Sequence, residues 1–391
     1  MTGTTVDRRA GAGLGTAAAG MLLIAATYGM ARFGVGLFAP SLSAQRPDLV
    51  DVLGWAGAAQ FTSYSLAAVL AARLVDRRPR AGLLLAGTTA TVGCLGVAVA
   101  STPAVFVVAV FIGGLGGGFA SPALVPVIDT VVDPRATATA QSVVNSGTAV
   151  GVIGAGVVAS VAASLGSAWM FMALVCAVST AAVWCPVRAR ADLTGADRPA
   201  AGPSSGPARG PWRLLVLPGA AAVVAGAGSS LVWTFGPLLV TGSGSVPAER
   251  VGWLWIALGL GGVLGILTGA LVRRTGTRAG WCWCAGSLSV ASAGVAVAVA
   301  AGSAWAACVS MAVFGAGYMG LSGVLIFWAR NVWPGRAGAG TSVLFIALAT
   351  GQALGSVGFG LARDVLGAVP LAVLAAGLCA LGGLTALARK R

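Results

Sequence analysis

One arginine lies inside an apolar stretch of the sequence, where a charge is unfavourable. Arg32 belongs to the segment TYGMARFGVGLFAP (residues 27–40), within an apolar run that begins near Gly15 and ends at Pro40. An arginine near the centre of a membrane helix is unfavourable by roughly 2.5 to 3.5 kcal/mol. Such a run inserts readily only if the guanidinium reaches water, headgroups or a polar partner. Arg32 is therefore a candidate for binding an anionic group; snorkelling to the interface or helix packing are the alternatives.

Groups that catalysis or metal binding would require are scarce. The sequence contains no histidine, its single lysine is Lys390, and none of its ten acids lies in the middle of an apolar run. The seven cysteines have no nearby histidine or carboxylate at ligand spacing. These residue types do not form a catalytic triad, a metal site or an acid–base pair, so neither an enzyme nor a cofactor is expected.

The composition indicates a polytopic membrane protein. Of the 391 residues, 57% are hydrophobic and 9% are charged, compared with about 25% charged in soluble proteins. Apolar runs of about 20 residues, each long enough to span a bilayer, fall near 15–39, 53–72, 82–101, 104–127, 141–163, 166–186, 214–240, 251–272, 280–300, 303–329, 341–362 and 368–388. We therefore expect an all-α fold with twelve transmembrane helices.

The distribution of charge predicts the orientation in the membrane. The net charge is +14, but no basic domain with interleaved aromatic residues indicates nucleic acid as a partner. If the N-terminus is cytoplasmic, 20 of the 24 basic residues fall in cytoplasmic segments, and only Arg46, Arg250 and Arg363 fall on the other side. This asymmetry predicts that both termini are cytoplasmic.

A segment rich in proline, glycine and charge divides the chain into two sets of six runs. The sequence predicts a cytoplasmic tail (1–13), a first half (14–187), a flexible linker (188–213), a second half (214–388) and a short tail (389–391). Glycines recur at corresponding positions of the halves: Gly114, Gly116, Gly147 and Gly151 match Gly315, Gly317, Gly351 and Gly355. This recurrence indicates an internal repeat.

The loop after the second run resembles a known family signature. Residues 72–80, ARLVDRRPR, are similar to the loop 2–3 signature G-x-L-x-D-R-x-G-R of the major facilitator superfamily, with Ala72 and Pro79 in place of the two glycines. YGMARFGVGLFAP is similar to the first helix of the YbfB/YjiJ-type bacterial branch. The resemblance implies two pseudo-symmetric six-helix halves that transport a solute across the bacterial inner membrane by alternating access.

The resemblance also implies a role for the signature loop. Its Asp76, Arg77 and Arg80 would latch the cytoplasmic ends of the two halves when the protein faces outward. Asp129, at the cytoplasmic end of the fourth run, could pair with Arg77 or Arg80. The alternative is that the loop only sets the topology.

In this family the transport path lies between helices 1, 4, 7, 10 and their neighbours. Candidate substrate-binding residues at mid-depth are Tyr28, Arg32, Gln60, Tyr64, Asn145, Trp233, Thr234, Tyr318 and Gln352. The three amide side chains are expected to face the bundle interior, because an amide needs partners in hydrocarbon. The aromatic side chains could instead be packing residues.

The expected function is secondary active transport of a small organic solute, with an organic anion favoured by Arg32. The alternatives are a drug or natural-product efflux carrier of the proton-antiport type, a membrane-embedded enzyme or a channel. Proton coupling would need Asp129 or a substrate that carries the proton, because no acid lies at mid-membrane. The expected partners are the small-molecule substrate, the lipid bilayer and a coupling proton, and the protein is expected to be a monomer.

Overall fold

The computed structural model describes residues 15–75, 78–133, 136–188, 212–334 and 337–387, and every regular element in these residues is a helix. The first half contains a helical stretch over residues 15–24, then η1 (Ala25–Arg32), α2 (Gly34–Leu37), α3 (Ala39–Gln45), α4 (Pro47–Val50), α5 (Leu53–Leu74), α6 (Pro79–Ala98), α7 (Pro103–Val131), α8 (Thr137–Val161) and α9 (Leu165–Arg188). The second half contains α10 (Trp212–Gly242), η3 (Ala248–Arg250), α11 (Val251–Val263), η4 (Leu264–Leu267), α12 (Thr268–Thr275), α13 (Thr277–Ala301), α14 (Ala304–Val332), α15 (Ala337–Ala362) and α16 (Ala368–Thr385).

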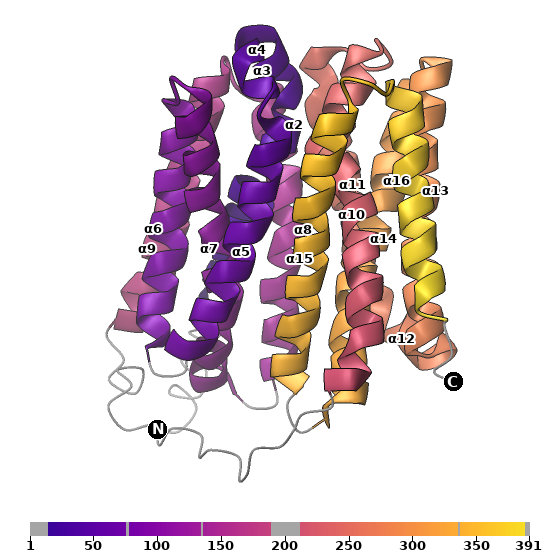
Figure 1. Cartoon of the computed structure of the whole chain (residues 1–391). Coiled ribbons are helices and arrows are strands. Elements are labelled where there is room, and N and C mark those ends of the chain that lie inside the picture. Colours follow the sequence, from indigo (N-terminus) through magenta and orange to yellow (C-terminus); the bar gives the residue numbers. More distant parts are fainter. Residues whose placement is uncertain (1–14, 76–77, 134–135, 189–211, 335–336, 388–391) are drawn as a thin grey trace, which may run out of the picture.

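The elements make twelve membrane-crossing segments in the described residues. Ten helical stretches are long and apolar enough to cross a bilayer. The other two are the first segment, which is interrupted after Arg32, and α5, whose mean hydropathy is lowered by polar residues such as Gln60 and Ser63. Figure 1 shows the two groups of helices side by side, the first in indigo to magenta and the second in pink to yellow. The expected all-α fold is confirmed, while the predicted linker and both terminal tails lie largely outside the described residues.

The repeated glycines pack the same pair of helices in each half. We call the first membrane segment, which comprises residues 15–24, η1 and α2, helix 1. A side chain at Gly151 of α8 would meet the carbonyl group of Ala25 in helix 1. In the second half, a side chain at Gly355 of α15 would meet the carbonyl group of Ala227 in α10. Small residues at such crossings let two backbones approach closely. The structure thus shows two pseudo-symmetric halves, with the fifth helix of each packed on the first.

The two halves meet along one part of the bundle. We call the end with Arg73, Arg78, Arg188, Arg213 and Arg330 the basic end, and the end with Arg46, Arg250 and Arg363 the opposite end. Near the opposite end, α5 packs on α15 and α8 packs on α11, so that added Cβ atoms at Gly54 and Gly156 would lie 2.7 Å and 2.6 Å from the carbonyl oxygens of Ser356 and Gly252. The hydrophobic core at the basic end of the first half contains only residues between Ala17 and Val187. The described contacts therefore close the molecule at the opposite end.

Candidate functional site

Helix 1 changes its hydrogen-bond pattern just before Arg32. Residues Ala25–Arg32 form a π-helix, and Phe33 then leaves the helical conformation with φ −97° and ψ 2°. π-Helical turns are rare and occur frequently at functional sites, because the added residue redirects the side chains that follow. Gly29 allows α8 to pack against this turn, since a Cβ there would lie 2.6 Å from the Cα atom of Gly151. As a result, Arg32 and Phe33 both point into the protein and are each 1% exposed.

The guanidinium of Arg32 lies among four aromatic rings. Its Cζ atom is 3.9 Å from the ring centroid of Tyr64 and 4.5 Å from that of Tyr28. The rings of Phe33 and Phe61 follow at 5.0 Å and 5.4 Å. Such contacts contribute about 0.5 to 2 kcal/mol each, so the rings offset part of the cost of burying the charge. No ion pair to Arg32 is found among the described residues.

The hydrogen-bonding groups of Arg32 are nevertheless not satisfied. Its Nε and Nη1 atoms are buried and have no hydrogen-bond partner in the described part of the chain. A ring face attracts a cation but does not replace an oxygen acceptor at the edge of the guanidinium, and each buried unpaired donor costs about 1 to 3 kcal/mol. A carboxylate, sulfonate or phosphate group would supply oxygen acceptors for these donors, and a planar guanidinium can bind such a group in a bidentate arrangement along one of its edges.

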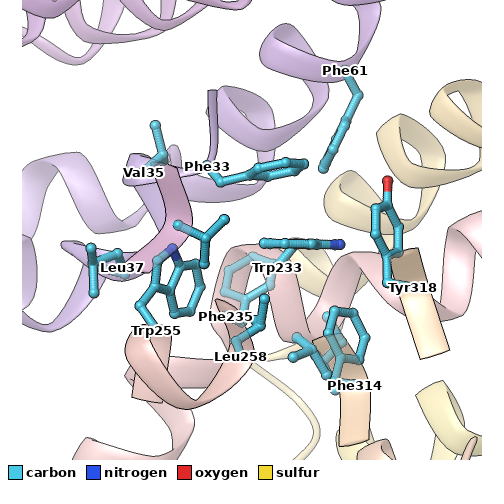
Figure 2. Close-up of a cluster of buried hydrophobic side chains, with 14 of the residues drawn as sticks. Phe33, Val35, Leu37, Phe61, Trp233, Phe235, Trp255, Leu258, Phe314 and Tyr318 are labelled. Carbon is cyan, nitrogen blue, oxygen red and sulfur yellow. The ribbon is translucent and has the colours of Figure 1, made fainter. Parts of the chain in front are cut away.

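Beside Arg32, an aromatic cluster joins the two halves. Phe33 of helix 1 lies parallel to the indole of Trp233 in α10, with ring centroids 3.9 Å apart and an interplanar angle of 16°. The ring centroids of Tyr318 and Phe314 of α14 lie 5.1 Å and 5.5 Å from that of Trp233, and the centroid of Trp255 of α11 lies 5.9 Å from it. Figure 2 shows the parallel rings of Phe33 and Trp233 with Tyr318 at their side. We refer to these five residues as the aromatic cluster.

Polar groups with unused hydrogen-bonding capacity surround the cluster. Gln352 of α15 donates from Nε2 to the Tyr318 hydroxyl at 3.0 Å, while its Oε1 atom has no partner among the described residues. The Oε1 atom of Gln60 and the Nε1 atom of Trp233 are likewise buried and unpaired there. Buried polar atoms in native proteins are usually paired, so a group of exceptions at one level is consistent with a site that a ligand completes.

Most of the predicted substrate residues come together. Tyr28, Arg32, Tyr64, Trp233 and Tyr318 contact one another directly or through Phe33. Gln60 and Gln352 are buried as expected, and the Thr234 hydroxyl hydrogen-bonds to Ser356 at 3.1 Å across the buried interior. Four aromatic residues of the site were not predicted from the sequence: Phe33, Phe61, Phe314 and Trp255. Only Phe33 could have been recognised, because it directly follows Arg32.

Asn145 is not part of this buried site. Its side chain is exposed, so it does not join the buried residues, and its place in a transport path stays a prediction. It lies one helical turn from Ala149, whose carbonyl oxygen would be 3.0 Å from a Cβ at Gly259 of α11. Asn145 therefore continues the face of α8 that packs on the second half, at a level where the two halves have separated.

The predicted gating residues are only partly described. Asp76 and Arg77 lie outside the described residues. Arg80 is half-buried at the start of α6, and Asp129 is exposed near the end of α7. Their role as a latch between the halves stays a prediction.

The structure contains an ion pair between the halves at the opposite end. Nη2 of Arg363, which follows α15, lies 3.1 Å from Oδ1 of Asp51, which precedes α5. In the sequence Arg363 served only as a topology signal, and this pair was not predicted. A second ion pair at this end is local: Nη2 of Arg46 lies 2.7 Å from Oδ2 of Asp48, which lowers the pKa of that carboxyl, and Arg46 also donates to the carbonyl oxygen of Ala100.

Comparison with known proteins agrees with this architecture. The family model of the Major Facilitator Superfamily matches residues 21–356. Among solved structures, a mutant of the nucleoside transporter NupG superposes with a TM-score of 0.76 at 12% identity, covering 96% of this chain and 98% of that one. A POT family transporter in complex with 5-aminolevulinic acid gives a TM-score of 0.73 at 10% identity, covering 96% and 95%. A search of curated protein sequences finds no significant match.

At these identities the structural neighbours establish the fold, while the sequence match establishes the family. The match extends from helix 1 to α15 and so includes both the aromatic cluster and Arg32. The family match, together with the twelve segments and the two similar halves, indicates membrane transport. The chain belongs to the Major Facilitator Superfamily.

Proposed function

We propose that this protein is a secondary transporter that carries a small organic anion across the bacterial inner membrane by alternating access. The observation that carries the proposal is Arg32, which is 1% exposed and whose Nε and Nη1 atoms have no partner among the described residues. An intramembrane charge without a protein partner is a functional site by default, and a substrate anion is the partner that transport would supply. In this proposal the two halves rock about the site and expose it to each side in turn.

The charge distribution supports an orientation for this cycle. If the basic end faces the cytoplasm, as the positive-inside rule predicts, the described conformation is closed to the outside. Tyr28, which contacts Arg32 on the side of the basic end, is only partly buried. This exposure is consistent with a substrate that reaches Arg32 from the cytoplasm. Cysteines placed at the exposed residues Arg330 and Glu249 test the orientation, because an impermeant maleimide added to intact cells should label only the second.

Substitution of Arg32 tests the anion site. In proteoliposomes, Arg32→Lys keeps the charge but loses the planar fork, and we expect about tenfold weaker binding of the transported anion. Arg32→Gln removes the charge, and we expect a loss of about a hundredfold, since hydrogen bonds to charged groups contribute about 1.5 to 3 kcal/mol. Arg330→Gln, an exposed arginine at the basic end, is the matched control. Wild-type affinity in both Arg32 variants, or a cationic substrate, would refute the proposal.

A further inference from the structure

The parallel rings of Phe33 and Trp233 add information about the shape of the substrate. We infer that the substrate is a planar aromatic acid whose ring enters between Phe33 and Trp233 while its acidic group binds Arg32. This inference rests on the proposed function, because it assumes that the unpaired guanidinium receives the anion.

The two rings belong to different halves of the protein. Phe33 lies in helix 1 and Trp233 in α10, and their contact, at 3.9 Å and 16°, is a face-to-face stack. A rocking movement of the halves separates these faces without changing the helices that carry them. The space that opens lies between two flat apolar surfaces, and it admits a flat ring more readily than a puckered one. Insertion breaks one stack and forms two, so the net gain is about one ring contact.

Arg32 would fix the direction in which such a ring enters. Its Cζ atom is 5.0 Å from the Phe33 ring centroid, so an acidic substituent on a ring over Phe33 lies next to the guanidinium. The Trp233 ring is 0% exposed in the described conformation, and its Nε1 atom is a further unpaired donor for an acidic or polar substituent. The charged guanidinium of Arg32 and the flat ring of Phe33 thus lie side by side in helix 1.

A hydrogen-bond acceptor also lies beside the stack. Tyr318 lies 6.5 Å from Phe33 and 5.1 Å from Trp233, centroid to centroid, and its hydroxyl accepts from Gln352. That bond orients the amide, whose Oε1 atom is buried without a partner among the described residues. A hydroxyl or amino group on the substrate ring would donate to this oxygen. The substrate class that fits all three features is an aromatic monoanion with a hydrogen-bond donor on its ring.

Matched acids test the inference by isothermal titration calorimetry of the purified protein. The probes are para-hydroxybenzoate, benzoate and cyclohexanecarboxylate, which carry the same acid on a flat ring with a donor, a flat ring and a puckered ring. We expect the two flat acids to bind about tenfold more tightly than cyclohexanecarboxylate, and para-hydroxybenzoate to bind most tightly of all. Phe33→Leu should reduce the preference for flat over puckered acids to less than about twofold, whereas Phe171→Leu, an exposed phenylalanine in α9, should retain it.

The possible outcomes separate this inference from the proposed function. If all three acids bind with equal affinity and Arg32→Gln abolishes that binding, the anion site is supported but the aromatic inference is wrong. If no acid binds the wild-type protein, the aromatic inference is wrong, while the proposed function is tested separately by the Arg32 variants with the transported solute. If Phe33→Leu retains the full preference for flat rings, the ring does not enter between Phe33 and Trp233. A separate variant, Gln352→Leu, should remove the advantage of para-hydroxybenzoate over benzoate if Oε1 of Gln352 accepts from the ring hydroxyl.

Discussion

The charge of Arg32 is surrounded by aromatic rings instead of an acid. Four ring centroids lie within 3.9 to 5.4 Å of its Cζ atom. Cation–π contacts of about 0.5 to 2 kcal/mol each oppose an effective desolvation penalty of several kcal/mol. The Nε and Nη1 atoms, unpaired among the described residues, add about 1 to 3 kcal/mol each, so burial of the charge carries a net cost. An arginine kept for packing alone would not leave its donors unpaired.

This balance leads to a prediction for Arg32→Met. Methionine fills a similar volume without charge, so the free energy of unfolding should increase by about 1 to 3 kcal/mol while transport is lost. Thermal unfolding in detergent, together with flux in proteoliposomes, measures both effects. A destabilised Arg32→Met protein would mean that the guanidinium stabilises the fold, and would argue against a binding role.

At the residue scale, the sequence predicts the charged and polar members of the site better than the aromatic ones. Arg32 and Gln352 can be recognised as site residues from the sequence, because a charge or an amide in hydrocarbon is unfavourable without a polar partner. Trp255 and Phe314 are not, because an aromatic residue in an apolar run is equally consistent with packing. Asn145 is exposed, so burial does not test the amide argument at that position.

At the scale of single elements, the irregular helices are what the sequence could not predict. The π-helix at Ala25–Arg32 and the 3-10 turn at Leu264–Leu267 both interrupt long, mainly apolar runs. A uniform apolar pattern contains no periodicity from which such a change in hydrogen bonding could be inferred. The glycine repeat was more informative, because it correctly paired Gly147 and Gly151 with Gly351 and Gly355.

The equivalent glycines should respond equally to substitution. Gly151→Val and Gly355→Val each place a side chain against a backbone carbonyl group of the neighbouring helix, Ala25 or Ala227. We expect each to lower the free energy of unfolding by about 1 to 3 kcal/mol or more through overpacking. Gly358→Val in α15 is the control, because a Cβ there has no heavy atom within 4 Å. Thermal unfolding of the three purified variants compares them. Equal stability of Gly151→Val and the Gly358 control would contradict the observed helix contact.

At the scale of the whole molecule, the number of segments and their division into halves could be read from hydropathy and charge. The conformational state, that is, which end of the bundle is closed, could not be inferred from hydropathy and charge. Which end is closed depends on contacts such as Gly36, where a side chain would meet the carbonyl group of Trp233. Both end states bury the same apolar helices in the same bilayer, so composition does not distinguish them. The relevant differences are a few contacts between the halves, and each shifts the equilibrium only slightly.

The ion pair between Asp51 and Arg363 is one of these contacts, and it leads to the last prediction. The pair joins the halves at the opposite end at 3.1 Å, and the Asp51 side chain is 81% exposed. An exposed pair contributes about 0.2 to 1 kcal/mol, so its loss should shift a balanced equilibrium by about 1.4-fold to fivefold toward the state open at that end. Asp51→Arg should shift it further, because it places two arginines side by side. The double variant Asp51→Arg with Arg363→Asp should restore the original balance.

Distances between spin labels provide the measurement. With the native cysteines replaced, labels at the exposed residues Ser43 and Glu249 report on the opposite end, and labels at Arg78 and Arg330 report on the basic end. In Asp51→Arg, the population with a long distance should increase for the first pair of labels and decrease for the second, since alternating access couples the two ends. High salt should reduce the difference between wild type and variant, because it screens the exposed charges. If both distance distributions stay unchanged in Asp51→Arg, the ion pair does not contribute to holding the halves together, and the packing of α5 on α15 and of α8 on α11 is sufficient to keep this end closed.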